Sequence, residues 1–334
     1  MTAAAAPTLD VVAIGNAIVD VLASCDDAFL AEHALTKGGM QLIDAATAES
    51  LYADMAAGKE ISGGSAANTL AGLAALGKTC GFIGQVNDDQ LGEVFTHDVR
   101  ALGIRFDTPA ARGDAPTARC LILVTPDAQR TMNTFLGASQ YLPASALDAD
   151  LIRSASILYL EGYLWDPEQP RAAMRAAIEA ARSAGRKVAF TLSDTFVIDR
   201  HRADFIDLVD KGLIDILFSN EAEIQSLAQT DDFDAALAAI GPRVPVLVST
   251  RSEKGAVAIV GGVRHEAPAA PVGQIVDTTG AGDLFAAGFL AGYLEDLGVR
   301  QCLELGAVAA AEVISHWGAR PEEDLKALRA RSLG

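Results

Sequence analysis

The chain has 334 residues, half of them hydrophobic, and a formal net charge of −18 at pH 7. A surface this acidic repels nucleic acid and anionic membranes, so we expect neither as a partner. The net charge does not exclude a nucleotide as a ligand, because a nucleotide needs only a local positive site. The length allows one large domain with an ample core.

Two further features of the sequence bear on its cellular context. Residues 1–7 are rich in alanine but lack a basic start and a long apolar core, so we expect a short disordered lead. No run approaches the roughly 18 apolar residues of a membrane-spanning helix. We expect the four scattered cysteines to be buried, reduced side chains of a cytoplasmic protein: Cys25, Cys80, Cys120 and Cys302.

The first part of the chain mixes short extended segments with helices. We expect extended segments at 9–14, 18–23, 36–44 and 79–85, and helices at 46–57, 66–76 and 89–102. Residues 104–135 then become rich in alternating β-type residues, with a hairpin formed by 117–125 and 130–135.

After the hairpin, strands and helices alternate. We expect strands at 156–161, 187–192, 214–219 and 244–250, and helices at 170–184, 202–211, 221–229 and 234–240. This rhythm predicts parallel strands with helices on both faces of one sheet. The early extended segments and the hairpin do not fit that sheet. We therefore predict one α/β domain over residues 1–334, with a small β-sheet lid formed by about 16–44 and 104–137.

The stretch 274–294 is a predicted strand, loop and helix suited to binding an anion. Gly280 and Gly282 let the backbone approach a ligand, and the amides of a helix N-terminus favour phosphate. Asp283 lies in the first turn of that helix, where a carboxylate competes with phosphate unless it has a role of its own. From the local sequence, an equal alternative is that Asp283 has no catalytic role and only complements the helix dipole.

Residues 72–79 match the P-loop pattern G-x-x-x-x-G-K-[ST], but in the wrong structural order. A P-loop needs a strand before it and a helix after it. Here the predicted helix comes first and the strand follows, so Gly77 is expected to end the helix.

Two polar groups near the start of the chain suggest a hydroxyl-binding site. Gly63 and Gly64 precede the helix that carries Asn68, and they allow a polar ligand to lie against the main chain. Asn16 and Asp20 follow the first strand, and a carboxylate can accept from two vicinal hydroxyls. The alternatives are a simple helix-start turn and a solvated lid residue.

Asn220 and Glu223 follow a predicted strand and open a helix. Their spacing predicts a capping box. Equally, the pair could order Mg²⁺ through its bound waters, because Mg²⁺ keeps several waters. The local sequence does not separate these two interpretations.

Taken together and in this order, these motifs resemble the ribokinase-like (PfkB) family of small-molecule kinases, and most closely its adenosine kinase branch. The resemblance extends over about 9–328 and implies a three-layer α/β/α sandwich with a mostly parallel central sheet and a β-lid. It also implies ATP as donor, Mg²⁺ as helper and a primary hydroxyl as acceptor. The expected acceptor is the 5′-hydroxyl of a nucleoside such as adenosine.

The resemblance also implies roles for individual residues. Asp283 is the expected general base, and Gly280, Ala281 and Gly282 form the anion hole. The acceptor-binding residues are expected to be Asn16, Asp20, Gly63, Gly64, Asn68 and Phe196, with Phe196 stacking on a nucleobase. Nucleotide contacts are expected from Asn220, Glu223, Thr250, Gly255 and Gly282, with Asn220 and Glu223 organising Mg²⁺.

The sequence departs from the family pattern at Ser252, where a glycine is usual, although Gly255 is where it is expected. A kinase for a simple sugar such as ribose or fructose is the alternative within the class, and a catalytically inactive nucleotide-binding protein is the alternative outside it. A monovalent cation, K⁺, near 277–279 and a monomeric or homodimeric state both remain open.

Overall fold

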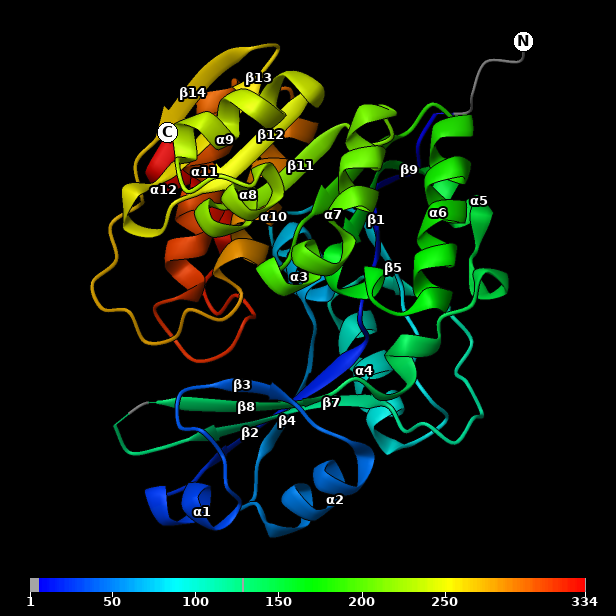
Figure 1. Cartoon of the computed structure of the whole chain (residues 1–334), viewed down its shortest axis with the longest axis vertical. Coiled ribbons are helices and arrows are strands. Elements are labelled where there is room, and N and C mark those ends of the chain that lie inside the picture. Colours follow the sequence, from blue (N-terminus) through cyan, green and yellow to red (C-terminus); the bar gives the residue numbers. More distant parts are fainter. Residues whose placement is uncertain (1–5, 128, 334) are drawn as a thin grey trace.

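Two β-sheets organise the described residues, which are 6–127 and 129–333 of the computed structural model. A nine-stranded sheet forms the body, and a five-stranded sheet lies apart from it at one end (Figure 1). Residues 1–5 of the predicted disordered lead lie outside the described residues.

The body sheet has the strand order β14-β13-β12-β11-β10-β9-β1-β5-β6. Its strands are β1 (Leu9–Ile14), β5 (Cys80–Ile83), β6 (Arg105–Phe106), β9 (Ala155–Glu161), β10 (Lys187–Thr191), β11 (Ile216–Asn220), β12 (Val246–Thr250), β13 (Ala256–Val260) and β14 (Val263–Ala267). Strands from β12 to β6 pair in parallel, and β13 and β14 extend the sheet as antiparallel strands. The carboxyl ends of the parallel strands therefore share one edge of the sheet.

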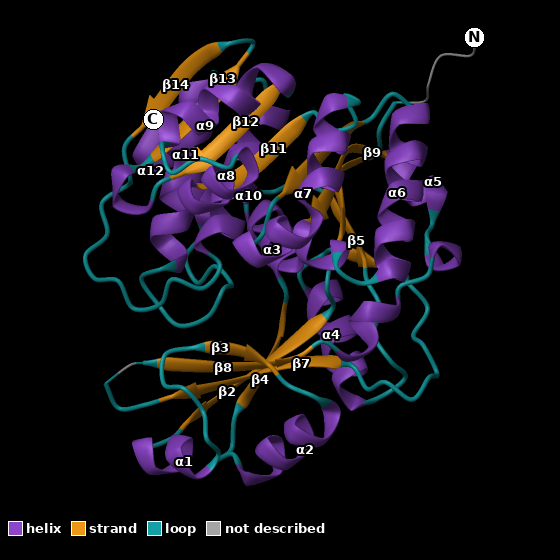
Figure 2. Ribbon diagram, viewed as in Figure 1, coloured by secondary structure: helices purple, strands orange, loops and turns teal. Residues whose placement is uncertain are grey.

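Both faces of the body sheet are buried. On β1, Val11 and Ala13 join one hydrophobic core while Val12 and Ile14 join the other, and all four are fully buried. Because side chains alternate along a strand, two cores require a helical layer on each face. The predicted three-layer α/β/α sandwich is confirmed (Figure 2).

The helices divide between these two layers and the second sheet. They are α1 (Asp27–Glu32), α2 (Ala45–Asp54), α3 (Ser65–Ala75), α4 (Gln90–Ala101), α5 (Ala149–Ser154), α6 (Glu168–Ser183), α7 (Thr195–Asp210), α8 (Glu221–Ala228), α9 (Phe233–Ile240), α10 (Ala281–Leu294), α11 (Val299–Val313) and α12 (Leu325–Leu333). Helices α3, α4, α10 and α11 contribute to the first core, and α5 to α9 contribute to the second.

The five-stranded sheet is the predicted lid. Its order is β3-β8-β7-β2-β4, with β2 (Ile18–Ser24), β3 (Met40–Leu42), β4 (Lys59–Gly63), β7 (Ala118–Val124) and β8 (Arg130–Phe135). The predicted hairpin is present as the antiparallel pair β7 and β8. Helices α1 and α2 lie on the side of this sheet that faces away from the body (Figure 1).

Three differences from the predicted elements concern the sheets. β6 belongs to the body sheet although it lies within the expected lid segment 104–137, and β4 belongs to the lid although it lies outside both segments. No strand forms within 268–280, where we expected one before α10. The amides of Val276 and Asp277 instead donate to the carbonyl of Ile314, which holds this stretch as a loop.

The P-loop-like stretch ends a helix, as predicted. Gly77 has φ +86° and its amide donates to the carbonyl of Ala74 at 2.9 Å, and β5 follows. All four cysteines are unpaired thiols. Across the described residues, no helix has the length and apolarity needed to cross a membrane.

Candidate active site

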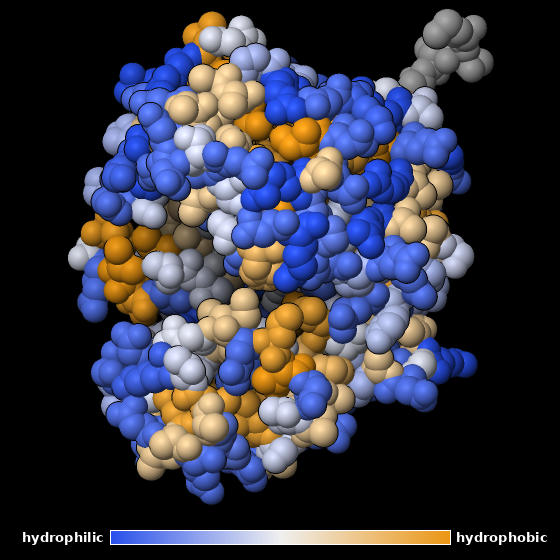
Figure 3. All heavy atoms as spheres, in the orientation of Figure 1, coloured by the Kyte–Doolittle hydropathy of each residue, from blue (hydrophilic) through white to orange (hydrophobic). Residues whose placement is uncertain are grey.

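A cavity of about 790 Å³ lies between the lid sheet and the carboxyl edge of the body sheet. In Figure 3 it opens as a hollow between the two parts, with hydrophobic residues along its lower edge. Ligands of open parallel sheets bind outside the carboxyl ends of the strands, so the position is typical of an active site. A second hollow, of about 580 Å³, runs along α4 and contains none of the predicted site residues.

Most of the predicted site residues line this one cavity. Only Gly63 and Gly255 do not, and the lining includes Asn16, Asp20, Gly64, Asn68, Phe196, Asn220, Glu223, Thr250, Gly280, Ala281, Gly282 and Asp283. They come from the ends of several different strands and from both sheets. The tertiary fold thus brings together motifs that are far apart in the sequence.

Asp283 lies in the first turn of α10 with both carboxylate oxygens hydrogen-bonded. Ser65 Oγ donates to Oδ1 at 2.6 Å, and Asn68 Nδ2 donates to Oδ2 at 3.0 Å. Burial raises the pKa of Asp283, while these two hydrogen bonds and the Arg320 guanidinium oppose the rise. The carboxylate is therefore held in one orientation by α3, with its base strength increased by burial.

The loop before Asp283 presents backbone amides to the cavity. Gly280 has φ +78°, and a Cβ there would meet Ala319 Cβ at 2.6 Å, so glycine is required for both conformation and space. A Cβ at Gly282 would meet nothing within 4 Å. The amides of Gly282 and Asp283 have no carbonyl to bond within the helix, so they remain available for an anion.

At the opposite side of Asp283, the two glycines before α3 fit tightly against Asn16, which precedes the first lid strand, and Asp20, which lies on it. A Cβ at Gly63 would lie 2.4 Å from Asp20 Oδ2, and one at Gly64, where φ is +91°, would lie 2.3 Å from the carbonyl oxygen of Asn16. We expected the glycines to admit a ligand to the main chain. In the structure they admit Asn16 and Asp20 instead, and these two side chains line the cavity.

Asp20 and Asn68 are the polar groups of this region that retain free acceptor atoms. Burial raises the pKa of Asp20 to about 6, although Arg320 and Arg130 oppose this rise. Within the described residues, Asn68 Oδ1 is buried and has no hydrogen-bond partner. A buried acceptor without a donor is costly, so this position suits a ligand hydroxyl.

Glu161, at the end of β9, was missed by the sequence analysis. Its Oε1 accepts from the amide and the side chain of Asn16 at 2.7 and 2.6 Å, and its Oε2 accepts from the amide of Ala66 at 2.8 Å. Burial raises its pKa to about 7, against the effect of these hydrogen bonds. Glu161 thus connects the end of the first strand to the start of α3. The only feature of the sequence that could have indicated this role is a Glu at the end of an apolar strand.

Asn220 and Glu223 form the predicted capping box at the start of α8. Asn220 Oδ1 accepts from the amide of Glu223 at 2.8 Å, and Glu223 Oε2 accepts from the amide of Asn220 at 3.1 Å. Both residues also line the cavity, and burial, followed by the charge of Asp194, raises the pKa of Glu223 to about 7. The structural and the ligand-facing interpretations are therefore compatible.

Aromatic and apolar side chains form another part of the cavity wall. Phe196 follows the N-cap Asp194 at the start of α7, and its ring centroid lies 6.1 Å from that of Tyr163. Facing them from the lid are Met40, Leu42, Ile122 and Met132. This wall offers apolar contact to a flat or hydrophobic group.

Ser252 and Gly255 shape the turn between β12 and β13 outside the cavity. Gly255 has φ +87°, and a Cβ there would meet the carbonyl oxygen of Ala267 at 2.2 Å. Ser252 has φ +51°, the left-handed region in which glycine is favoured. The turn therefore keeps the left-handed conformation without the usual glycine.

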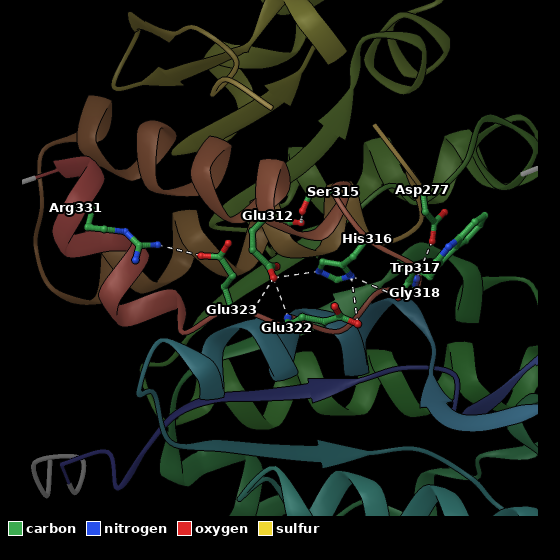
Figure 4. Close-up of polar contacts among 9 residues, drawn as sticks. All are labelled: Asp277, Glu312, Ser315, His316, Trp317, Gly318, Glu322, Glu323 and Arg331. Carbon is green, nitrogen blue, oxygen red and sulfur yellow. Dashed lines mark hydrogen bonds and ion pairs between the residues drawn. The ribbon is translucent and has the colours of Figure 1, made fainter. Parts of the chain in front are cut away.

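A loop after α11 supports the predicted anion-binding loop, and the sequence analysis did not identify it. The amide of Gly318 donates to Asp277 Oδ2 at 2.9 Å (Figure 4). Asp277 Oδ1 accepts from the amide and hydroxyl of Thr279 at 3.0 and 2.7 Å. The same loop is tied back to α11, because His316 Nε2 lies 3.0 Å from Glu312 Oε1 (Figure 4).

Arg320, from the same loop, brings a positive charge close to Asp20 and Asp283, which are predicted site residues. It donates to the carbonyl of Ser62 at 2.6 and 3.0 Å and to that of Ala67 at 2.7 Å. Burial lowers its pKa to about 10, and the charges of Asp20 and Asp283 oppose this change. An arginine near the end of the chain has no local pattern that would have predicted this role.

A buried carboxylate beside a helix N-terminus, in a cavity between the two sheets, fits an α/β enzyme of the phosphoryl-transfer class. The comparisons with known proteins agree with this class. Residues 39–325 match the model of the pfkB family carbohydrate kinases, so the chain belongs to that family. It is accordingly a phosphotransferase that acts on an alcohol group, and ATP is the expected donor, usually with Mg²⁺.

Two solved structures are similar over almost the whole chain. The adenosine kinase from Sinorhizobium meliloti is 46% identical, with a TM-score of 0.90, and covers 98% of this chain and 99% of its own. A probable sugar kinase protein from Rhizobium etli is 45% identical, also with a TM-score of 0.90, and covers 97% and 98%. A fructokinase from Klebsiella pneumoniae is 31% identical over 69% of this chain and 76% of its own. The family match and the similarity to the adenosine kinase support the adenosine kinase-like branch.

Proposed function

We propose that the protein transfers the γ-phosphoryl group of ATP to the 5′-hydroxyl of a nucleoside such as adenosine. The observation that carries the proposal is the cluster around Asp283. Its carboxylate is oriented by Ser65 and Asn68, next to the free amides of α10 and in the same cavity as Asp20. One side of this cluster suits a phosphate and the other suits hydroxyl groups.

Asp283 acts as the base that accepts the hydroxyl proton of the acceptor. Phosphoryl transfer passes through a loose transition state, so catalysis depends mainly on positioning and on stabilising charge. The first-turn amides of α10 are placed to stabilise the negative charge of the transferred group. Asp283 needs only to accept the proton late, which a carboxylate with a raised pKa does well.

Asn220 and Glu223 are the residues proposed to hold Mg²⁺ through water. Among the described residues, no group of three His, Cys, Asp or Glu side chains is arranged as a metal site. One buried carboxylate and one amide at the cavity wall instead suit a hydrated cation, since Mg²⁺ keeps most of its waters. When bound, the metal supplies neutralising charge to the phosphates. A monovalent cation near 277–279 stays a prediction.

The acceptor cavity supports a nucleoside over a simple sugar. Asp20 and the free Oδ1 of Asn68 suit the hydroxyls of a ribose. The wall formed by Tyr163, Phe196 and the apolar lid residues suits the flat face of a base, which gains from burial against aromatic rings. A free sugar has no flat apolar face to pack against Tyr163 and Phe196.

A coupled ADP-release assay tests the proposal. The purified full chain is assayed with ATP and Mg²⁺ against adenosine, inosine, cytidine, ribose and fructose, and without acceptor. We expect the highest kcat/KM with a nucleoside and negligible ADP release without acceptor, because the lid excludes water. Turnover of ribose or fructose above every nucleoside would show that the acceptor is a sugar. Absence of turnover with every acceptor would contradict the kinase assignment.

A further inference from the structure

The acceptor side of the cavity contains few polar side chains that are free to bind a ligand. Several lining residues are already committed: Asn16 to Glu161, Ser65 and Asn68 Nδ2 to Asp283, Thr134 to Cys120, Asp166 to Arg200 and His201, and Asp194 to the amide of Phe196. Besides Asn68 Oδ1, three polar groups remain. They are the carboxylate of Asp20, the hydroxyl of Tyr163 and the carboxamide of Gln140, which form no side-chain hydrogen bond to any described residue.

Gln140 lies on the part of the cavity wall where the lid meets the body. It belongs to a 3₁₀ turn, Gly137–Tyr141, which directly follows lid strand β8, and Leu136 just before this turn also lines the cavity. Tyr163 lies in a second 3₁₀ turn, Gly162–Trp165, and both turns pack against α6. Gln140 and the aromatic wall are thus supported by the same helix.

A free carboxamide beside an apolar wall has a defined hydrogen-bonding preference. It offers one donor and one acceptor side by side, which is the pattern that pairs with the N6 amino group and N7 of a 6-aminopurine. The corresponding edge of a 6-oxopurine presents two acceptors, O6 and N7, so only one of the two hydrogen bonds can form. The unmatched atom then costs desolvation energy without a partner.

We propose that Gln140 contacts the edge of the acceptor's base and makes the enzyme prefer 6-aminopurine nucleosides to 6-oxopurine nucleosides. This inference rests on the proposed nucleoside kinase activity. In it, Asp20 holds the ribose hydroxyls, Phe196 and Tyr163 contact the face of the base, and Gln140 identifies its edge. Asp20 and Gln140 thereby bind separate parts of one ligand.

The test compares the wild-type chain with Gln140→Leu, using adenosine, inosine, 7-deazaadenosine and ribose as acceptors. Gln140→Leu should lower kcat/KM for adenosine about ten- to a hundredfold, since a bidentate contact of this kind discriminates by such a factor. The loss should appear mainly in KM, because the contact is remote from the reacting atoms. Inosine should change only a few-fold. Gln301→Leu, the same substitution on the exposed face of α11, should change none of these values.

7-Deazaadenosine tests the same contact without altering the protein. It lacks N7, so wild-type enzyme should use it less well than adenosine, and Gln140→Leu should reduce its kcat/KM little further. An equal loss for adenosine and inosine in Gln140→Leu, or no loss for either, would overturn the role of Gln140 while nucleoside turnover itself persists. If ribose is phosphorylated and no nucleoside is, the proposed acceptor is wrong and the inference falls with it.

Discussion

Arg130, on lid strand β8, forms an ion pair with Asp277 in the loop that precedes α10. The two side chains are only 9% and 3% exposed, and Arg130 Nη1 also donates to Thr279 Oγ1 at 2.9 Å. The Arg130 guanidinium carbon lies 4.9 Å from the centre of the Trp317 ring. The lid is therefore joined to the predicted phosphate-binding side of the body by a buried charge pair.

Removing one partner of this pair should destabilise the protein more than removing both. Arg130→Met and Asp277→Asn each leave the other charge less well paired in a poorly solvated position, and we expect each to lower the free energy of unfolding by roughly 3–5 kcal/mol. The double variant should lose less than either single variant, and therefore clearly less than their sum. Urea denaturation of the four proteins gives the coupling energy. Additive losses would show that the pair does not act as a unit.

Asp283→Asn should abolish most turnover while the nucleotide still binds. The asparagine can keep contacts with Ser65 and Asn68 but cannot accept the hydroxyl proton, so kcat should fall by about 10²- to 10⁴-fold. ATP binding, measured by calorimetry, should stay within a few-fold. Asp296→Asn, an exposed position just after α10, is the matched control. A rate close to wild type in Asp283→Asn would exclude Asp283 as the base.

Stability should decrease as pH rises from about 5 to 8. Burial raises the pKa of Asp20 to about 6, and the pKa values of Glu161 and Glu223 to about 7. In this interval the folded state holds protons that the unfolded chain has already lost, so increasing pH favours unfolding. A folded-state pKa that is higher by one than the unfolded-state pKa corresponds to about 1.4 kcal/mol, enough to lower the Tm of a chain of this length by about 2 °C. Asp127 and Glu295, with pKa values lowered to about 2, act only at more acidic pH.

Thermal unfolding across this pH range provides the measurement, and Glu161→Gln provides its control. The variant removes one of the three titrating groups, so its Tm should depend less steeply on pH. Its Tm should also be lower throughout, because a glutamine cannot accept from both Asn16 and Ala66 in the same way. A wild-type Tm that rises with pH over this interval would contradict the predicted direction.

The turn at Ser252 should tolerate glycine, whereas Gly255 should not tolerate alanine. Ser252→Gly removes left-handed strain of roughly 1–2 kcal/mol but adds flexibility to the unfolded chain worth about 0.5–1 kcal/mol, so a small gain in stability is expected. Gly255→Ala adds backbone strain of roughly 1–3 kcal/mol and a contact with the Ala267 carbonyl. Chemical denaturation of both variants tests this. Equal effects would show that the turn adapts freely.

The sequence alone determined the body of the fold. Alternating strands and helices require a sheet covered on both faces, and this local periodicity predicted the sandwich and the β7–β8 hairpin. It also separated the true helix N-terminus at Asp283 from the P-loop-like stretch at Gly77, because the order of strand and helix is a local property. The motifs around Asp20, Asn68 and Asn220 were also found from local sequence, because each lies at the junction of a predicted strand or helix.

The tertiary structure alone decided which groups complete the site. Glu161, Arg130 and Arg320 act on the motifs through contacts between residues far apart in the chain, and no local pattern of the sequence encodes such pairs. The short strand β6 was assigned to the wrong part, and β4 was not predicted as a strand, since a short strand depends on its partners rather than on its own residues. Likewise, the apolar stretch before α10 is a loop because its amides bond to Ile314 rather than to a strand. Local sequence sets periodicity and helix ends, whereas burial, long-range charge pairs and free hydrogen-bonding atoms exist only once the chain has folded.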